Sequence, residues 1–160
     1  MSTRVRRCTS RGIANCAEVP VIYLKSQKLL IGVDELASRL RDHQLRIIDC
    51  RFDLMDPGAG RDSYLAGHIP GTRNLPFTEA LNEDGTFRPE KELEALWQGI
   101  LGDSKDVDWS AMCGSGVTAC HLAISALLAG YREPGLYVGS WSEWIRNPDR
   151  PVATGAAPDT

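Results

Sequence analysis

The chain has 160 residues, which is enough for one domain with a single sizeable hydrophobic core. Its formal net charge of −3 argues against a general affinity for nucleic acid or for an anionic membrane. Its longest apolar stretch, residues 117–130, contains His121 and Ser125 and is too short and too polar to span a bilayer. We therefore expect a soluble protein with neither nucleic-acid nor membrane partners.

The start of the chain is basic. Residues 1–17 contain no acid, and their four basic residues are Arg4, Arg6, Arg7 and Arg11. This composition is typical of an organelle transit peptide or of a disordered basic start in a bacterial protein. We predict a cytoplasmic protein, with a mitochondrial one as the alternative. We also predict an extension over residues 1–30, one domain over residues 31–154 and a tail over residues 155–160, with fraying from Ala153 onward.

The first half of the domain contains one clear helix and one clear strand. Apolar residues spaced by four, after acids in the first turn, predict a helix over residues 32–40. Residues 45–49 read as a short strand that ends at an acid. Residues 57–60 (PGAG) predict a loop, residues 64–67 one helical turn, and residues 68–71 (HIPG) a tight connection.

The second half alternates more regularly. We predict helices over residues 89–100, 117–128 and 141–145, and strands over residues 107–112 and 136–138. The helix over residues 117–128 is apolar on most sides, which indicates burial against a sheet. Strands that alternate with helices indicate an α/β domain with a mostly parallel sheet and right-handed crossovers.

The most informative segment is CGSGVTAC, residues 113–120. Cys113 comes at the carboxyl end of a predicted strand, two glycines follow within three residues, and a helix begins at once. Glycines allow a sharp turn in which successive amides point at one atom, and the helix start adds unpaired amides and a positive dipole end. We expect this arrangement to lower the pKa of Cys113, so that its thiolate can attack sulfur and carry it as a persulfide.

The remaining cysteines have other roles in this interpretation. The chain has five cysteines and no CxxC pair, which indicates neither a disulfide framework nor a zinc site. For a lone cysteine, simple burial is the usual explanation, and it is what we expect for Cys120 and Cys50. Cys8 and Cys16 fall in the basic extension. We predict no metal and no cofactor.

Three separated motifs resemble one known family. CGSGVTAC, the earlier GHIPGTRNLPF (residues 67–77) and the late LYVGSWSEW (residues 136–144) look like the rhodanese fold, over residues 33–154. They are most similar to the catalytic carboxyl-terminal domain of the thiosulfate and 3-mercaptopyruvate sulfurtransferases. The resemblance implies a single rhodanese-like α/β domain with five parallel strands and helices on both faces.

The resemblance also implies an activity and a set of site residues. Cys113 corresponds to the family's persulfide cysteine, which would pass sulfur from 3-mercaptopyruvate or thiosulfate to cyanide, a low-molecular-weight thiol or a thioredoxin-like protein. Thiosulfate-type loops carry basic residues where this chain has Gly114 and Ser115, so the donor preference is for 3-mercaptopyruvate, with Ser115 assisting proton transfer. The remaining implied substrate-binding residues are Arg61, Gly114, Gly116, Val117 and Thr118. Such enzymes are normally tandem, so we expect weak activity here or self-association as a homodimer.

The neighbouring motifs are interpreted as structural. Asp49 and Arg51 resemble the family's Asp-x-Arg, and we expect a buried ion pair rather than catalysis. His68 is a candidate general base, but in GHIPG a structural hydrogen bond is the better explanation. We expect Trp141 and Trp144 to pack beneath the cysteine loop.

Two other functions compete with this interpretation. A cysteine phosphatase needs an arginine at the end of its loop to bind phosphate, and this loop has no cation, which argues against that activity. The alternative that stays open is a rhodanese-like binding module or a persulfide carrier without turnover.

Overall fold

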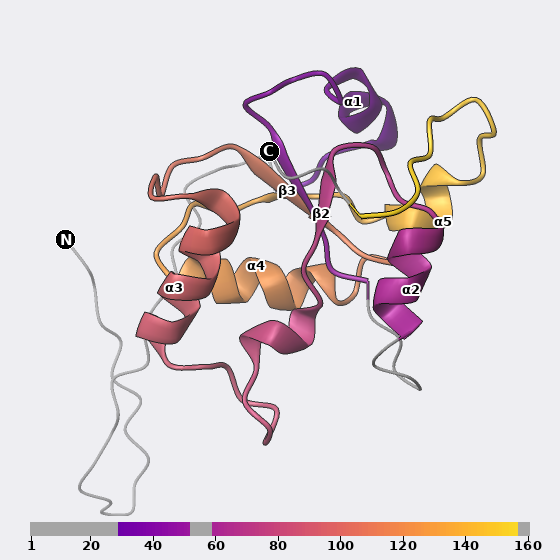
Figure 1. The fold of residues 1–160 in the computed structure, drawn as a ribbon. Coiled ribbons are helices and arrows are strands. Elements are labelled where there is room, and N and C mark those ends of the chain that lie inside the picture. The colour runs from indigo at the N-terminus through magenta and orange to yellow at the C-terminus, as the bar shows by residue number, and fades with distance from the viewer. Residues whose placement is uncertain (1–28, 52–58, 157–160) are drawn as a thin grey trace, which may run out of the picture.

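The computed structural model describes residues 29–51 and 59–156 (Figure 1). Its elements in chain order are α1 (Val33–Ser38), β1 (Arg46–Asp49), α2 (Ala59–Ala66), β2 (Thr72–Asn74), the 3-10 helix η1 (Phe77–Ala80), α3 (Glu90–Leu101), β3 (Trp109–Met112), α4 (Ala119–Leu128), β4 (Gly135–Leu136) and α5 (Ser140–Trp144). The predicted extension lies outside the described residues except for residues 29 and 30. Residues 157–160 of the predicted tail also lie outside them.

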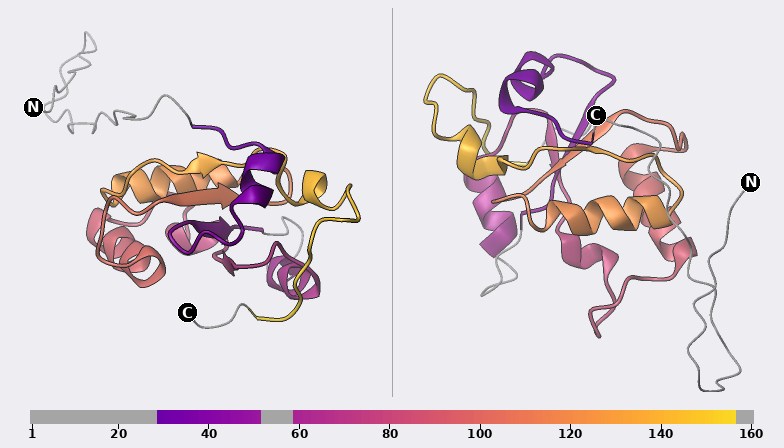
Figure 2. Two further views of the ribbon diagram at one scale, coloured as in Figure 1. Left: turned by 90° about the horizontal axis from the view of Figure 1, so that it is seen from above. Right: turned by 180° about the vertical axis from the view of Figure 1, so that it is seen from behind.

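The strands form one parallel sheet in the order β2-β1-β3-β4, and the left view of Figure 2 shows them side by side. In the centre, Ile48 of β1 pairs with Ala111 of β3. The described residues form four strands, one fewer than the five predicted. At the edge next to β4, the chain makes only an isolated parallel bridge between Leu30 and Leu136.

Helices cover both faces of the sheet, as predicted. One core cluster joins β1 and β3 to α3 and α4, with Leu93 and Trp97 from α3 and Leu122 from α4. A second cluster on the opposite face joins the same strands to α1 and α5 through Leu36 and Trp144. Figure 1 shows α3 and α4 on one side of the strands and α1 on the other, with α2 and α5 at one end of the molecule.

The predicted helix over residues 89–100 illustrates why these elements form. Acids at Glu90 and Glu92 lie in the first turn of α3, where they interact favourably with the positive end of the helix dipole. Leu93, Trp97 and Leu101 repeat every four residues and are all buried, so the helix has one apolar face. The helix ends before Gly102, whose φ of 87° few other residues would adopt.

Several predicted boundaries were wrong. Helix α2 begins at Ala59, so it includes part of the segment predicted as a loop, and strand β2 and the helix η1 were missed. Helix α4 begins at Ala119 rather than at residue 117. The chain does not fray at Ala153, because Ala153 bridges His68 and the amide of Gly155 donates to the carbonyl of Leu65.

Candidate active site at the carboxyl end of β3

Cys113 directly follows β3, whose four residues are all buried. The loop of residues 113–118 then leads straight into α4, which packs back against the sheet. The side chain of Cys113 is itself buried, with an exposed fraction of 2%. Burial alone would favour the neutral thiol, so an ionised sulfur here needs hydrogen-bond donors around it.

Main-chain amides of the loop and of the first residue of α4 supply these donors. The amide of Gly116 donates to Sγ of Cys113 at 2.9 Å, and the amides of Ser115 and Ala119 also lower the pKa of this thiol. Gly116 has a φ of 89°, and a β-carbon there would lie 2.5 Å from the carbonyl oxygen of Val138. Only glycine therefore allows the loop to turn at this point and keep its amide on the sulfur.

Cys50 is the further donor, and it lies beside Cys113. It follows β1, and its amide donates to the carbonyl of Met112 at 2.9 Å. The side-chain hydrogen bond from Cys50 is the largest cause that lowers the pKa of Cys113, followed by that of Thr118 and the two amides of Ala119 and Ser115; burial acts in the opposite direction. Together these contacts lower the pKa of Cys113 from 9.0 to about 4. The site therefore holds a thiolate at neutral pH.

The segment before and within α5 fixes the backbone of the cysteine loop. The hydroxyl of Ser140 accepts a hydrogen bond from the amide of Cys113 at 3.1 Å and donates to the carbonyl of Tyr137 at 2.8 Å. The amides of Trp141 and Ser142 donate to the carbonyls of Cys113 and Gly114, each at 3.0 Å. The loop is thus held between two helices, with α4 on one side and α5 on the other.

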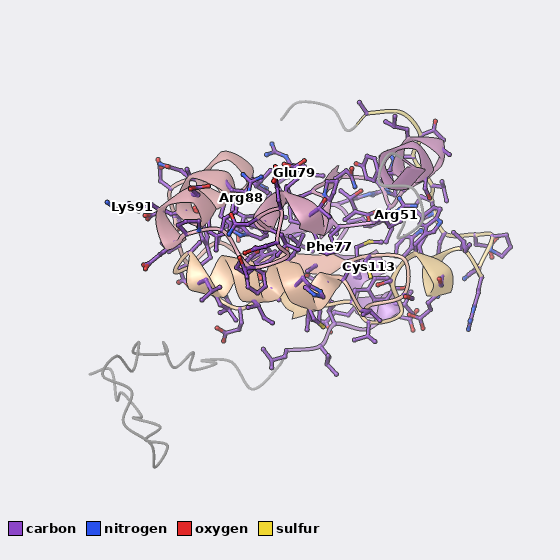
Figure 3. The ribbon with its side chains drawn as sticks, turned by 90° about the horizontal axis from the view of Figure 1, so that it is seen from below. Arg51, Phe77, Glu79, Arg88, Lys91 and Cys113 are labelled. Atoms are coloured by element: carbon purple, nitrogen blue, oxygen red, sulfur yellow. The ribbon has the colours of Figure 1, made fainter. Side chains whose placement is uncertain are left out.

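A buried ion pair supports the same region from β1. Arg51 binds Asp49 at 2.8 Å, and both side chains are almost fully buried, which confirms the predicted pair. Arg51 also donates to the carbonyl of Gly67 at 2.7 Å and lies 4.6 Å from the ring centre of Trp141, so it links α2 to α5. Figure 3 shows Arg51 and Cys113 toward the α2 and α5 end of the domain, away from Arg88 and Lys91.

His68 and the two tryptophans are structural in this arrangement. His68 is buried, its Nδ1 lies 3.0 Å from the carbonyl oxygen of Tyr64, and its ring stacks on that of Tyr64. A structural role was the predicted one. Trp144 is fully buried in the second core cluster, and the partly buried Trp141 packs against that cluster.

The structure brings together most of the predicted site residues. Gly114, Gly116 and Thr118 lie with Cys113 in one loop, and the hydroxyl of Thr118 contacts both Cys113 and Cys50. Ser115 contributes its amide, but its side chain is exposed and makes no hydrogen bond to any described residue. Its predicted part in proton transfer stays a prediction.

Two other predicted site residues lie differently. Val117 is exposed, at 67%, at the rim of the loop. Arg61 lies in α2 rather than on a loop, and its side chain is outside the described residues, so its predicted binding of a carboxylate stays a prediction.

Sequence reasoning misjudged three residues. Cys120 is exposed, so the prediction that it belongs to the core was wrong. Cys50 was expected to be simply packed, whereas it also contacts the reactive sulfur, and Ser140 was not singled out at all. The motif GSW offered a signal for Ser140, because a serine at the start of a short helix commonly hydrogen-bonds to nearby backbone.

Within residues 29–51 and 59–156, no cluster of three or more His, Cys, Asp or Glu side chains is placed to bind a metal ion. No helix in the same ranges is both long enough and apolar enough to cross a membrane.

Comparisons with known proteins agree with this geometry. A family model described as a rhodanese-like domain matches residues 32–147. A probable 3-mercaptopyruvate sulfurtransferase of Pseudomonas aeruginosa is 42% identical over 128 residues, which cover 79% of this chain and 45% of that protein. A thiosulfate sulfurtransferase of Rattus norvegicus is 36% identical over 143 residues, covering 81% and 46% of the two chains. The chain thus spans less than half the length of these relatives.

The fold is also similar to that of solved structures. An anaerobic ergothioneine biosynthesis enzyme from Chlorobium limicola, in complex with trimethyl histidine, superposes with a TM-score of 0.66 at 24% identity. The match covers 87% of this chain and 34% of that one. At this level of identity the similarity supports the fold alone.

Proposed function

The chain belongs to the rhodanese-like domain family, and from this premise we propose that it is a sulfurtransferase that carries sulfur as a persulfide on Cys113. The observation that carries this proposal is the ring of donors around one buried sulfur, with the amide of Gly116 at 2.9 Å. The same donors that stabilise a thiolate can stabilise the anionic outer sulfur of a persulfide.

The proposed reaction has two steps. First, the thiolate of Cys113 attacks the sulfur of the donor: 3-mercaptopyruvate loses its C–S bond and leaves as pyruvate after taking a proton, or thiosulfate loses its S–S bond and leaves as sulfite. Second, a thiol or cyanide attacks the outer sulfur of the persulfide, and Cys113 departs as the thiolate. Both steps use Cys113 in its charged form, which is the form that the site favours.

Between the two donors, we propose 3-mercaptopyruvate. Thiosulfate is a dianion, and the loop of residues 113–118 contains no basic residue to hold it. Arg88 and Lys91, which Figure 3 labels, lie away from Cys113. The named relatives include proteins for both donors, so the support for this choice comes from the chemistry of the loop. A thioredoxin-like protein or a small thiol is the proposed acceptor.

Turnover and intact mass measured together test the proposal. The protein is incubated with 3-mercaptopyruvate or with thiosulfate, cyanide is added, and thiocyanate is measured. We expect faster turnover with 3-mercaptopyruvate, and a mass gain of one sulfur when the acceptor is left out. Cys113→Ser should abolish both, whereas Cys120→Ser, which removes an exposed thiol, should keep both. Sulfur loading without turnover from either donor would instead support a persulfide carrier.

A further inference from the structure

Cys50 and Cys113 occupy corresponding positions at the ends of neighbouring strands. Asp49 and Met112, the last residues of β1 and β3, pair with each other, and each cysteine is the next residue in the chain. Because side chains alternate along a strand, corresponding positions place both side chains on the same face of the sheet. Both cysteines belong to the core cluster that α3 and α4 cover, and Cys50 is fully buried.

The thiol of Cys50 has three acceptors within reach. Its Sγ lies 3.1 Å from the carbonyl oxygen of Met112 and 3.7 Å from the hydroxyl oxygen of Thr118, and the sulfur of Cys113, at the corresponding position beside the neighbouring strand, is the third. A thiol has one proton to donate. The two oxygens are neutral, whereas the sulfur of Cys113 is charged as a thiolate, and a hydrogen bond to a charged acceptor is roughly twice as strong. The proton should therefore point to Cys113 whenever that sulfur is ionised.

The same contact moves the pKa values of the two sulfurs in opposite directions. Burial, followed by the hydrogen bond with Cys113, raises the pKa of Cys50 well above its ordinary value, so Cys50 keeps its proton. The pKa of Cys113 moves in the opposite direction. The pair thus consists of one thiol donor and one thiolate acceptor at neutral pH.

We propose that Cys50 is a positioning residue of the sulfur-transfer site, whose buried thiol donates a hydrogen bond to the sulfur of Cys113 when that sulfur carries negative charge. Its part in turnover rests on the proposed function. Sγ of Cys113 is negative as the nucleophile of the first step and again as the leaving group of the second. It is neutral in between, when it bridges to the outer sulfur. Cys50 therefore helps to keep Cys113 ionised before the first step and stabilises it as the leaving group of the second, without giving up its own proton.

The test measures the ionisation of Cys113 in the unloaded protein. The rate of alkylation by iodoacetamide is followed at Cys113 by peptide mass mapping across acid and neutral pH. Two substitutions of similar size are compared: Cys50→Ser keeps a donor, and Cys50→Val removes it. Cys120→Ser is the control for loss of a thiol elsewhere.

We expect Cys50→Val to raise the pKa of Cys113 by about one unit, which is a tenfold loss of thiolate on the acid limb of the profile. Cys50→Ser should stay closer to the wild type, and in the valine variant the second step of sulfur transfer, in which Cys113 is the leaving group, should slow. A wild-type profile for folded Cys50→Val would overturn the proposal, and so would a serine variant that matches the valine variant, since packing alone would then explain both. If Cys50→Val does not fold, Cys50→Ala takes its place in the same comparison.

The alkylation profile needs no sulfur donor. If the wild type loads no sulfur but the pKa of Cys113 rises in Cys50→Val, the proposed function is contradicted and the proposed hydrogen bond is supported. The reverse result, normal sulfur transfer with an unchanged profile, would contradict only the role of Cys50.

Discussion

The hydroxyl of Ser140 accepts a hydrogen bond from the amide of Cys113 at 3.1 Å, although 27 residues separate them in the chain. Ser140 is fully buried and has a φ of 52°, a backbone conformation that residues other than glycine rarely adopt. Ser140 keeps this unfavourable conformation while its hydroxyl binds the amide of Cys113. We infer that the conformation serves to position the cysteine loop. Sγ of Cys113 also lies 4.0 Å from the same hydroxyl.

Ser140→Ala should therefore destabilise the protein and disturb the loop. The substitution leaves the amide of Cys113 and the carbonyl of Tyr137 without a partner in a buried place, which costs about 1–3 kcal/mol. Urea unfolding measures the change, and Cys113 alkylation should slow in parallel. Ser142→Ala is the matched control, because its hydroxyl is exposed and its loss should cost less than about 0.5 kcal/mol. Equal effects of the two substitutions would contradict the role of Ser140.

Gly116→Ala should displace the cysteine loop. The new β-carbon would lie 2.5 Å from the carbonyl oxygen of Val138, and the φ of 89° would itself cost about 1–3 kcal/mol for alanine. We expect lower stability and slower sulfur transfer, since the amide bonded to Cys113 must move. Gly114→Ala serves as the comparison for stability, because a β-carbon there meets nothing within 4 Å. A Gly116→Ala protein with wild-type stability would contradict the argument.

The fold was largely predictable because its strong elements carry local signals. Strand β1 is rich in β-branched residues, and α3 repeats apolar residues every four positions. Strand β2 was missed because it has only three residues, Thr72–Asn74, all of them polar. Only their pairing with β1 makes them a strand. Cys120 was misplaced because α4 looks apolar all round, while its real exposed face includes Cys120 and Ile124.

The site was predictable only as far as its contacts are local. Cys113 and the amides that follow it lie within one short segment, so their meeting follows from the loop itself. Cys50 and Ser140 reach the same sulfur or its backbone from β1 and α5. Their approach depends on strand order and register, which no local pattern in one sequence specifies.

The reactivity of Cys113 should be nearly independent of pH around neutrality. Because its pKa is about 4, the alkylation rate should stay level down to about pH 5 and fall tenfold per unit well below pH 4. In urea-unfolded protein the same residue should titrate near its ordinary value of 9.0. If the alkylation rate of the folded protein instead began to fall near that value, Cys113 would not be a thiolate at neutral pH.

The same shift predicts how stability depends on pH. The pKa of Cys113 is lower in the folded state than in the unfolded one, so ionisation stabilises the fold fully above pH 9.0 and progressively less as pH falls toward about 4. The free energy of unfolding of the wild type minus that of Cys113→Ser should therefore increase as pH rises through this window. A difference that stays constant with pH, measured by urea unfolding, would contradict the prediction.

Arg51→Met should be among the most destabilising substitutions in the domain. Breaking a buried ion pair by removing one partner costs about 3–5 kcal/mol, because Asp49 is left buried without its counter-charge. Burial already raises the pKa of Asp49 against the opposing effect of Arg51, and without the arginine it should rise further. Adding Asp49→Asn should recover part of the loss, which a double-mutant cycle of urea unfolding measures. Additive effects of the two substitutions would show that the pair is not coupled.

Thr118 and Ser115 both follow Cys113 closely in the chain, but the structure separates their effects on its sulfur. Thr118→Val removes a hydroxyl that helps lower the pKa of Cys113 and that also contacts Cys50, so the acid limb of the alkylation profile should move to higher pH. Ser115→Ala should leave that limb unchanged, because Ser115 bonds the sulfur through its amide, which alanine keeps. If Ser115 assists proton transfer to the donor, its alanine variant should slow turnover of 3-mercaptopyruvate while the alkylation profile stays that of the wild type. A pKa that moves with Ser115→Ala and not with Thr118→Val would reverse this assignment of the two hydroxyls.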